Sequence, residues 1–571
     1  MQEKIIIVGA GVMQGPAIRI AKELGFYTVA VDGSSAAPCV ALADQFEQID
    51  LKDKEGIEAC AHSLLHSGGL AGIMTAGTDF SATVAWVAER LGLPGIPYES
   101  ALNASDKARM RSCFKKAGLP SPEFTAITGD DTLQEPPLPF PLVIKPVDNM
   151  GGRGCRRVDT MEELREAAAD AIRFSRSGRA IAEAFMEGPE FSVDAIVYHG
   201  EITICGLADR HIFFPPYFIE MGHTMPADSA PAEQAALLET FCAGVRALGL
   251  AGEHSIGAAK GDIKLTPRGP MIGEIAARLS GGYMSGWTYP YSSGVEPIRA
   301  AILAAAGRKP ENLAPLKTWT SAERAFISIP GTVKAVSGTE TARGRPHVQD
   351  LFFRIAQGDK VGFPQNNVSK CGNVISAASE RRIAVEAAEN AVRSILIRLD
   401  PHDGETAAFL AASGEGFPPD AFQLSAELRA ALEKLPDSGD KANSPHFTTE
   451  DTEYHGVLVR KSSLSSVKLR VTPWLKILKS MMPQPPLIPF PEFANSGLRD
   501  YVGRTVTESL QAVREITGLS LPEISAETVK SSDNKGSFPK KGFLGKSFWA
   551  ALVRGGYQGA VYYIDQWRGE H

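Results

Sequence analysis

The sequence has no closely spaced cysteine pair, no excess of basic residues and no long apolar run. Its seven cysteines stand singly, with no CxxC pair, so nothing predicts a cysteine-bound metal cluster, and reduced thiols of this kind are typical of a cytoplasmic protein. The formal net charge of -7 leaves no overall basic surface for a nucleic-acid backbone. No stretch approaches the roughly 18 apolar residues that span a bilayer. We therefore expect a cytoplasmic protein that binds neither nucleic acid nor membrane.

The sequence is long enough to form several domains. At 571 residues it is too long for one hydrophobic core, and roughly one domain per 150 residues predicts three or four units. Residues 1–94 alternate apolar strands, such as KIIIVGAG and YTVAVDG, with amphipathic stretches, which is typical of helices around a parallel sheet. A charged helix is expected over 105–117. After residue 400 the amino-acid composition changes, with stretches rich in Gly, Ser and Pro. This change indicates a separate appendage.

The first turn of this pattern is rich in glycine. Gly9, Gly11 and Gly15 precede a helical stretch, and Asp32 ends the second strand, which resembles a dinucleotide-binding fingerprint. The spacing is loose, and such turns also serve to pack a strand closely against a helix. An NAD-dependent oxidoreductase is therefore a minor alternative.

A second glycine-rich loop follows the strand LVIKP. This strand delivers Lys145, and the loop over 149–154 leads straight into another strand, which separates it from a P-loop. Lys145 supplies a point charge for phosphate oxygens, while Gly151, Gly152 and Gly154 let backbone N–H groups approach an anion. A plain hairpin with one lysine is the alternative interpretation.

Two further segments carry acidic residues in strands. In AIAEAFMEGPEF, the connector after Glu183 can offer the backbone around Phe185 to adenine. Glu190 can accept hydrogen bonds from ribose hydroxyls. Sequences of this kind are also common in hairpins without a ligand. In GDIKLTPRGPMIGEIAARLSGG, Asp262 and Glu274 can lie side by side on paired strands, which gives hard oxygen ligands for Mg²⁺, although such carboxylates are also often simply solvated. Arg278 follows four residues later.

The order and spacing of these segments, preceded by Asp106-Lys107, resemble the ATP-grasp superfamily over roughly residues 1–399. The similarity is strongest to the branch with biotin carboxylase, carbamoyl phosphate synthetase halves and L-amino-acid ligases. It implies a multidomain α/β and α+β fold. The implied domains are a Rossmann-like preATP-grasp domain over 1–104, an ATP-grasp domain over 105–315, a C-terminal sheet-plus-helix module over 316–400 and an additional domain of unknown role over 401–571.

The resemblance also implies the cofactors and the roles of individual residues. ATP and Mg²⁺, with Mn²⁺ as a substitute, are the expected cofactors, and Lys145 and Arg278 are the implied catalytic residues. The implied contacts are Lys107, Lys145, Gly151, Gly152 and Gly154 for the phosphates, Glu183 and the backbone of Phe185 for adenine, Glu190 for ribose, Asp262 and Glu274 for the metal, and Arg278 for the acyl phosphate. A homodimer is compatible with the family.

The substrate segment and one departure from the family pattern complete the prediction. The expected substrate contacts come from 208–227, with Arg210, His211, Tyr217 and His223 as candidates. Ala276 stands where the family usually has a metal-binding Asn, although Mg²⁺ readily accepts water ligands instead.

The preferred hypothesis is an ADP-forming carboxylate–amine ligase that acts through an acyl phosphate on an amino acid or small carboxylate. The alternatives are an ATP-binding regulatory or assembly protein without turnover, and a carboxylase of the biotin carboxylase type. The chain has no Met-Lys-Met biotinyl signature, which speaks against the carboxylase.

Overall fold

The computed structural model describes residues 2–129, 133–310, 313–436, 487–521 and 544–570. The chain divides into two compact units, the first made of residues 1–397 with 416–418 and the second of residues 398–415 with 419–571. The parts predicted to bind ATP all belong to the first unit. Within the described ranges, none of the helices combines the length and the hydropathy needed to cross a bilayer.

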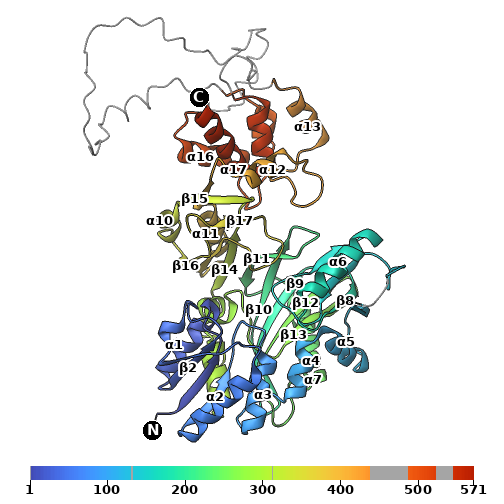
Figure 1. The fold of residues 1–571 in the computed structure, drawn as a ribbon, viewed down its shortest axis with the longest axis vertical. Helices are drawn as coiled ribbons and strands as arrows, with labels where there is room; N and C mark the ends of the chain where they lie inside the picture. Colours follow the sequence, from blue (N-terminus) through green and yellow to red (C-terminus); the bar gives the residue numbers. More distant parts are fainter. Residues whose placement is uncertain (1, 130–132, 311–312, 437–486, 522–543, 571) are drawn as a thin grey trace, which may run out of the picture. The chain divides into compact units, whose positions relative to one another are not determined.

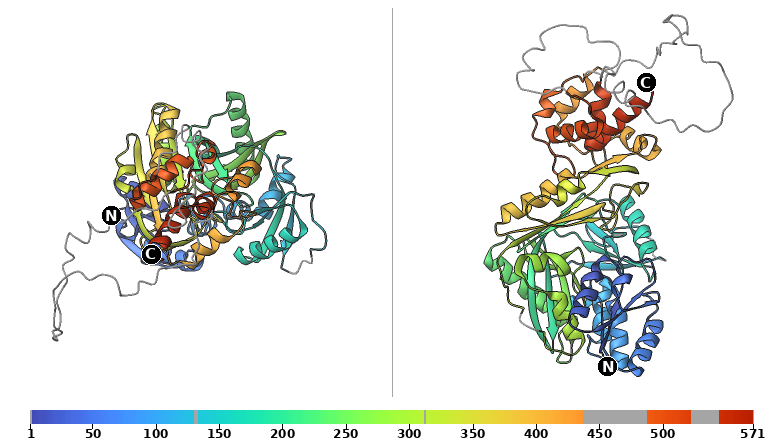
Figure 2. Two further views of the ribbon diagram at one scale, coloured as in Figure 1. Left: turned by 90° about the horizontal axis from the view of Figure 1, so that it is seen from above. Right: turned by 90° about the vertical axis from the view of Figure 1, so that its left-hand side faces the viewer.

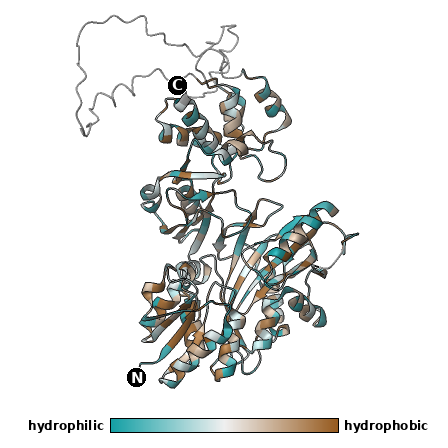
Figure 3. Cartoon of the chain, viewed as in Figure 1, coloured by the Kyte–Doolittle hydropathy of each residue, from teal (hydrophilic) through white to brown (hydrophobic). Residues whose placement is uncertain are grey.

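The first unit begins with a parallel four-stranded sheet in the order β3-β2-β1-β4, which confirms the predicted arrangement (Figures 1 and 2). Its two central strands are mostly apolar, and Figure 3 colours them as predominantly hydrophobic. The elements are β1 (Lys4–Val8), α1 (Gly15–Glu23), β2 (Tyr27–Asp32), β3 (Gln45–Gln48), α2 (Lys54–His66), β4 (Leu70–Met74) and α3 (Ser81–Leu91).

The glycine-rich turn after β1 is closed by its own neighbours. The N–H of Ala10 donates to the Asp32 carboxylate at 2.8 Å, and the N–H of Gly11 donates to Gln14 Oε1 at 3.0 Å. A side-chain carbon on Gly9 would lie only 3.0 Å from the Gln14 side chain. Because these side chains already occupy the turn, its geometry favours the close-packing interpretation over a dinucleotide site.

A second, antiparallel sheet has the order β5-β8-β6-β7. The helix expected over 105–117 is α5 (Lys107–Lys116), which begins after Asp106 because this residue is extended and caps the helix by accepting from the N–H groups of Ala108 and Arg109 at 2.9 and 3.0 Å. The elements are α4 (Tyr98–Ser105), α5 (Lys107–Lys116), β5 (Phe124–Thr128), β6 (Leu142–Pro146), β7 (Arg156–Val158), α6 (Met161–Phe174) and β8 (Arg179–Ala184).

The largest sheet has eight strands in the order β13-β12-β9-β10-β11-β14-β18-β16. Strands of the predicted C-terminal module continue this sheet, since β14 pairs directly with β11. The division of the chain into four domains therefore stays a prediction, with no break in the sheet at residue 316. The elements are β9 (Glu190–Tyr198), β10 (Glu201–Phe213), β11 (Ile219–Met225), α7 (Pro231–Ala247), β12 (Ile256–Thr266), β13 (Gly269–Ala276), α9 (Pro297–Ala305), β14 (Thr320–Phe326), β16 (Val348–Phe353), β18 (Gly372–Ala378) and α11 (Arg381–Ser394).

The second unit is mainly helical over its described residues. Its core contains an aromatic cluster in which the rings of Phe490, Phe493 and Trp549 lie within 6.0 Å of one another, centroid to centroid. The long helix α17 is interrupted at Gly556, whose φ of 61° and ψ of -152° are non-helical. The elements are α12 (Gly404–Ala411), α13 (Ala426–Glu433), α15 (Pro491–Ala494), α16 (Val506–Thr517) and α17 (Lys546–Glu570). Much of the predicted appendage, 437–486 and 522–543, lies outside the described residues.

Candidate functional site

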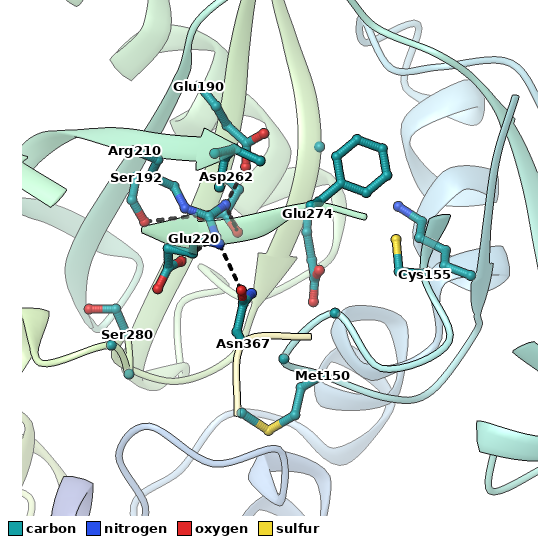
Figure 4. Close-up of a pocket in the computed structure, with 18 of the residues that line it drawn as sticks. Met150, Cys155, Glu190, Ser192, Arg210, Glu220, Asp262, Glu274, Ser280 and Asn367 are labelled. Atoms are coloured by element: carbon teal, nitrogen blue, oxygen red, sulfur yellow. Dashed lines mark hydrogen bonds and ion pairs between the residues drawn. The ribbon is translucent and has the colours of Figure 1, made fainter. Parts of the chain in front are cut away.

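A cavity of about 340 Å³ in the first unit is lined by residues of both antiparallel sheets and of the loops beside them (Figure 4). It brings together nearly all of the residues that the sequence singles out. The predicted site residues that line it are Lys107, Lys145, Gly151, Gly152, Glu183, Phe185, Glu190, Asp262, Glu274 and Arg278. Gly154 does not line the cavity; a side-chain carbon there would lie 3.0 Å from the Phe174 ring, so its glycine allows close packing of the loop.

The lining of this cavity is rich in positive charge. Nine Lys and Arg side chains line it against five Asp and Glu side chains. A concave, partly buried surface with this excess concentrates anions, because field lines are focused where water is excluded. The charge therefore suits a polyphosphate ligand, although the chain as a whole is acidic.

Lys107, the first residue of α5, is held at the base of the glycine-rich loop. Its ammonium group donates to the carbonyl of Asn149 at 3.0 Å and lies 3.7 Å from the Glu274 carboxylate. Burial opposes the charge, but the neighbouring carboxylates of Glu274 and Asp79 raise the pKa of Lys107 above its ordinary value. Lys107 is thus a permanently charged group that ties the loop to the acidic hairpin.

Lys145 is positioned by a buried ion-pair network. Glu183, only 2% exposed, accepts from Lys145 Nζ at 2.7 Å and from Arg111 Nε at 2.9 Å. Burial raises the pKa of Glu183, but the charges of Arg111 and Lys145 outweigh this and lower it below its ordinary value. Glu183 therefore fixes the predicted phosphate-binding lysine. Its predicted contact with adenine stays a prediction.

Glu183→Gln is expected to destabilise the first unit. The substitution leaves the buried charges of Arg111 and Lys145 without their carboxylate, and a broken buried pair costs about 3–5 kcal/mol. The measurement is chemical denaturation followed by circular dichroism. Glu99→Gln is the matched control, because Glu99 pairs with Arg109 at 2.6 Å but is 75% exposed. Equal stability changes in the two variants would contradict the assigned role.

The connector after β8 has one backbone group already engaged within the protein. The N–H of Phe185 donates to the Pro141 carbonyl at 3.1 Å and is therefore not available to a ligand. The next residue, Met186, also lines the cavity, and none of the described residues accepts from its N–H. The Phe185 ring faces Phe218 with the ring centroids 6.4 Å apart. The Phe185 N–H is thus excluded, and the contact of this backbone with adenine stays a prediction.

The two predicted metal ligands are cross-strand neighbours. Asp262 on β12 and Glu274 on β13 are paired in the antiparallel ladder. Asp262 is already engaged, since it accepts from Arg210 at 2.8 Å, from Ser192 Oγ at 3.0 Å and from Lys260. Burial raises the pKa of Glu274, but nearby lysines, led by Lys107, lower it far below its ordinary value. Glu274 is thus a carboxylate whose cation partner at 3.7 Å is not in hydrogen-bonding contact.

Ala276 supplies no oxygen ligand to the hairpin. Ala276 pairs across the ladder with Lys260, whose ammonium group bonds to Asp262. Over the described ranges, no group of three or more His, Cys, Asp or Glu side chains is placed to hold a metal ion. Two hard carboxylate ligands nevertheless fit Mg²⁺, which takes its remaining ligands from water and phosphate. Glu274 would bind the ion directly. Asp262 would bind it only after giving up its ion pairs with Lys260 and Arg210.

Arg278 is a buried cation with an unfilled donor. It is 7% exposed, its Nη1 donates to the adjacent Leu279 carbonyl at 3.2 Å, and its Nε has no acceptor among the described residues. The turn that follows is rigid, because Ser280 donates from its N–H at 3.0 Å and from its hydroxyl to buried Asp194. Arg278 thus faces the cavity ready to bind an anion.

Only part of the predicted substrate segment reaches the cavity. Arg210 and His223 line it, whereas His211 and Tyr217 do not. His211 bonds instead to Thr224 at 2.9 Å, and burial lowers its pKa to about 3. Burial also opposes the charge of His223, but Glu220 and Glu323 raise its pKa to about 9. Sequence reasoning missed several lining residues that carry no local motif, namely Met13, Glu220, Asn367 and Lys370.

Comparison with known proteins finds two family matches in the chain. Residues 104–282 match the family model of the ATP-grasp domain, and residues 325–400 match that of the L-amino acid ligase C-terminal domain 2. The chain therefore contains an ATP-grasp domain and a domain of the kind found at the C-terminus of L-amino acid ligases. The fold class and the family predicted from the sequence are therefore confirmed.

Relatives and solved structures extend the comparison. The chain is 26% identical to an uncharacterised protein, y4rH, of Sinorhizobium fredii over 59% of this chain and 70% of the relative. It is 33% identical to a D-alanine–D-alanine ligase of Halorhodospira halophila over 26% of this chain, and 25% identical to carnosine synthase 1 of Gallus gallus over 54%. The matches span 50% and 35% of those two enzymes.

Among solved structures, the chain resembles an L-amino acid ligase from Bacillus licheniformis, with a TM-score of 0.62 and 21% identity over 70% of this chain and 99% of that one. It also resembles N5-carboxyaminoimidazole ribonucleotide synthetase from Thermotoga maritima, with a TM-score of 0.53 and 18% identity over 70% and 100% of the two chains. These structures establish the fold of the first unit.

Proposed function

We propose that the protein is an ATP- and Mg²⁺-dependent carboxylate–amine ligase that acts through an acyl phosphate on an amino acid or a small carboxylate and releases ADP and phosphate. One observation carries the proposal. A single cavity gathers two lysines for phosphate, the carboxylate pair Asp262–Glu274 and the buried, unfilled Arg278. The matches to the ATP-grasp domain and to the L-amino acid ligase C-terminal domain support it.

In the first step a carboxylate oxygen of the substrate attacks the γ-phosphorus of ATP. The bond between that phosphorus and the bridging oxygen breaks, and ADP leaves. Lys107 and Lys145 bind the phosphates and hold them in line, and Arg278 stabilises the charge on the transferred group. Mg²⁺, when bound, neutralises phosphate charge.

In the second step the amine nitrogen attacks the acyl carbon, the carbon–nitrogen bond forms, and the carbon–oxygen bond to phosphate breaks. Inorganic phosphate leaves, and the amine loses a proton to solvent. No nucleophilic side chain is needed, because the acyl phosphate is itself the activated species. The groups of the cavity therefore act by positioning and by charge stabilisation.

A second candidate is an ATP-binding regulatory protein without turnover. The observation that favours it is the engagement of Asp262 by Lys260 and Arg210, together with Ala276 at the usual Asn position. Its prediction is ATP binding with no substrate-dependent release of ADP. A cytoplasmic location and a homodimer remain predictions for either function.

The test is to incubate the purified protein with ATP, Mg²⁺ and pairs of amino acids and small carboxylates, to follow phosphate release, and to separate ADP from AMP. The proposal predicts phosphate and ADP that depend on both substrates. AMP as the product would overturn the acyl phosphate route, and ATP binding without turnover would favour the regulatory candidate.

A further inference from the structure

The segment 366–370, which precedes β18, contacts the glycine-rich loop over 149–154. The N–H of Asn367 donates to the carbonyl of Gly151 at 2.8 Å. A side-chain carbon on Gly151 would lie 3.7 Å from Cγ1 of Val368, so the loop and the segment are also in van der Waals contact. Asn367 and Val368 both line the cavity, as the loop does. The predicted phosphate-binding loop therefore has a partner in the predicted C-terminal module, far along the chain.

The side chain of Asn367 fixes this segment to β11. Its Oδ1 accepts from the N–H of Glu220 at 2.8 Å, and Lys370 Nζ donates to the carbonyl of Glu220 at 2.6 Å. These two bonds satisfy both backbone polar groups of Glu220, where β11 extends past its ladder with β14. Figure 4 shows Asn367 between Glu220 and Met150, a residue of the loop. Asn367 thus joins the loop to β11, with its N–H on one side and its side chain on the other.

The bond from Asn367 leaves the donors of the loop free. It engages a carbonyl of the loop, whereas over the described ranges the N–H groups of residues 151–154 donate to no acceptor. Gly151 and Gly152 have φ values of 70° and 73°, a conformation that glycine adopts without strain. Successive N–H groups in such a turn form a concave site for an anion. The segment therefore holds the loop without competing with a phosphate for its N–H groups.

We propose that Asn367 is a positioning residue, which joins the glycine-rich loop to β11 and so holds the loop over the phosphates of the nucleotide. The proposal rests on the proposed function and deepens it, because it gives the C-terminal module a part in closing the nucleotide site. Asn367 acts through Gly151 and Glu220 and does not take part in the chemistry itself.

The same contacts connect the loop with the acidic hairpin. Glu220 Oε2 accepts from Arg210 Nη2 at 2.6 Å, and Arg210 Nη1 lies 2.8 Å from the Asp262 carboxylate. The contacts from Gly151 through Asn367 and Glu220 to Asp262 lie wholly within the first unit. A loop released from them would admit water to the acyl phosphate. Water would then attack the acyl carbon, the carbon–oxygen bond to phosphate would break, and the carboxylate and inorganic phosphate would form without the amide.

The first test compares Asn367→Ala with the unaltered full chain. Alanine removes the acceptor of the Glu220 N–H and so frees the segment from β11. Trypsin is expected to cleave after Arg153, within the loop, about tenfold faster, and a non-hydrolysable ATP analogue with Mg²⁺ is expected to bind about tenfold more weakly, as for the loss of one hydrogen bond. Cleavage is followed by mass spectrometry and nucleotide binding by titration calorimetry.

Two further variants make the result specific. Asn367→Asp keeps an acceptor oxygen of the same shape, so its cleavage after Arg153 is expected to stay at the rate of the unaltered protein. Gln365→Ala is the matched control, because Gln365 is an exposed residue just before the segment and does not line the cavity. It should change neither cleavage nor nucleotide binding.

The second test measures the phosphate released for each amide formed. In Asn367→Ala this ratio is expected to rise about threefold, because water reaches the acyl phosphate. Unchanged cleavage and nucleotide affinity in Asn367→Ala, equally fast cleavage in Asn367→Asp, or an unchanged ratio would overturn the assignment. Failure of the proposed function is a separate result. In that case the unaltered protein would form no amide from any pair of substrates, yet cleavage after Arg153 and nucleotide binding would still respond to Asn367→Ala.

Discussion

Glu274→Gln is expected to lower Mg²⁺-dependent formation of ADP by about 100- to 1,000-fold, the range found when one preorganised electrostatic contact to a transition state is removed. The amide keeps the shape of the side chain but loses the charge that suits a hard metal ion. Glu274 is the carboxylate that the structure leaves accessible, 3.7 Å from Lys107, whereas Asp262 is held by three side chains. The primary measurement is steady-state ADP release over a range of Mg²⁺ concentrations.

Two further measurements make this result specific to the metal. Mn²⁺ binding, followed by electron paramagnetic resonance in the presence of ATP, should weaken in the same variant. Glu201→Gln is the matched control, because Glu201 is an exposed residue of β10 in the same sheet and does not line the cavity. Unchanged ADP release and Mn²⁺ affinity in Glu274→Gln would remove Glu274 from the metal site.

Arg278→Met is expected to reduce kcat by about 100- to 1,000-fold while the KM for ATP changes by less than about threefold. Methionine fills the space of the arginine stem without its charge. We expect kcat to fall without a change in the KM for ATP because Arg278 lies in the turn beside Glu220, whereas Lys107 and Lys145 are the residues that would bind the phosphates. The measurement is initial-rate kinetics with ATP and the second substrates varied separately.

Arg268→Met provides the comparison for Arg278. Arg268 stands in the exposed turn between β12 and β13 and does not line the cavity, so its substitution should leave the kinetics unchanged. A rise in the KM for ATP in Arg278→Met, with kcat preserved, would place this arginine at the nucleotide instead of at the acyl group.

The sequence predicted the site where its residues lie within single local motifs. The Lys145 loop, the connector after β8 and the Asp262–Glu274 hairpin are each a strand with its adjoining turn, so their spacing alone places them. The parallel sheet was predictable for the same reason, since alternating apolar strands and helices allow few arrangements. The charged helix was predicted to within two residues at its start, where Asp106 is the extended N-cap of α5, whereas α4 before it was not predicted.

The rest of the site depends on contacts between strands and helices that are far apart in the sequence. The periodicity of apolar residues does not predict such contacts. Glu220 and Lys370 are 150 residues apart and meet because β11 pairs with β14 and β14 with β18. Arg111 reaches Glu183 from a helix whose sequence shows only a charged face. The Phe185 N–H is likewise engaged by the carbonyl of Pro141, 44 residues earlier in the chain. These contacts follow from the fold and have no signature in the sequence.

The most direct test of the central claim is the fate of oxygen from the substrate carboxylate. An amino acid labelled with ¹⁸O in its carboxylate is incubated with the protein, ATP, Mg²⁺ and an amine, and the products are analysed by mass spectrometry. An acyl phosphate intermediate predicts that the released inorganic phosphate carries one ¹⁸O atom and that the nucleotide product is unlabelled ADP. Unlabelled phosphate, or ¹⁸O in AMP, would contradict the account.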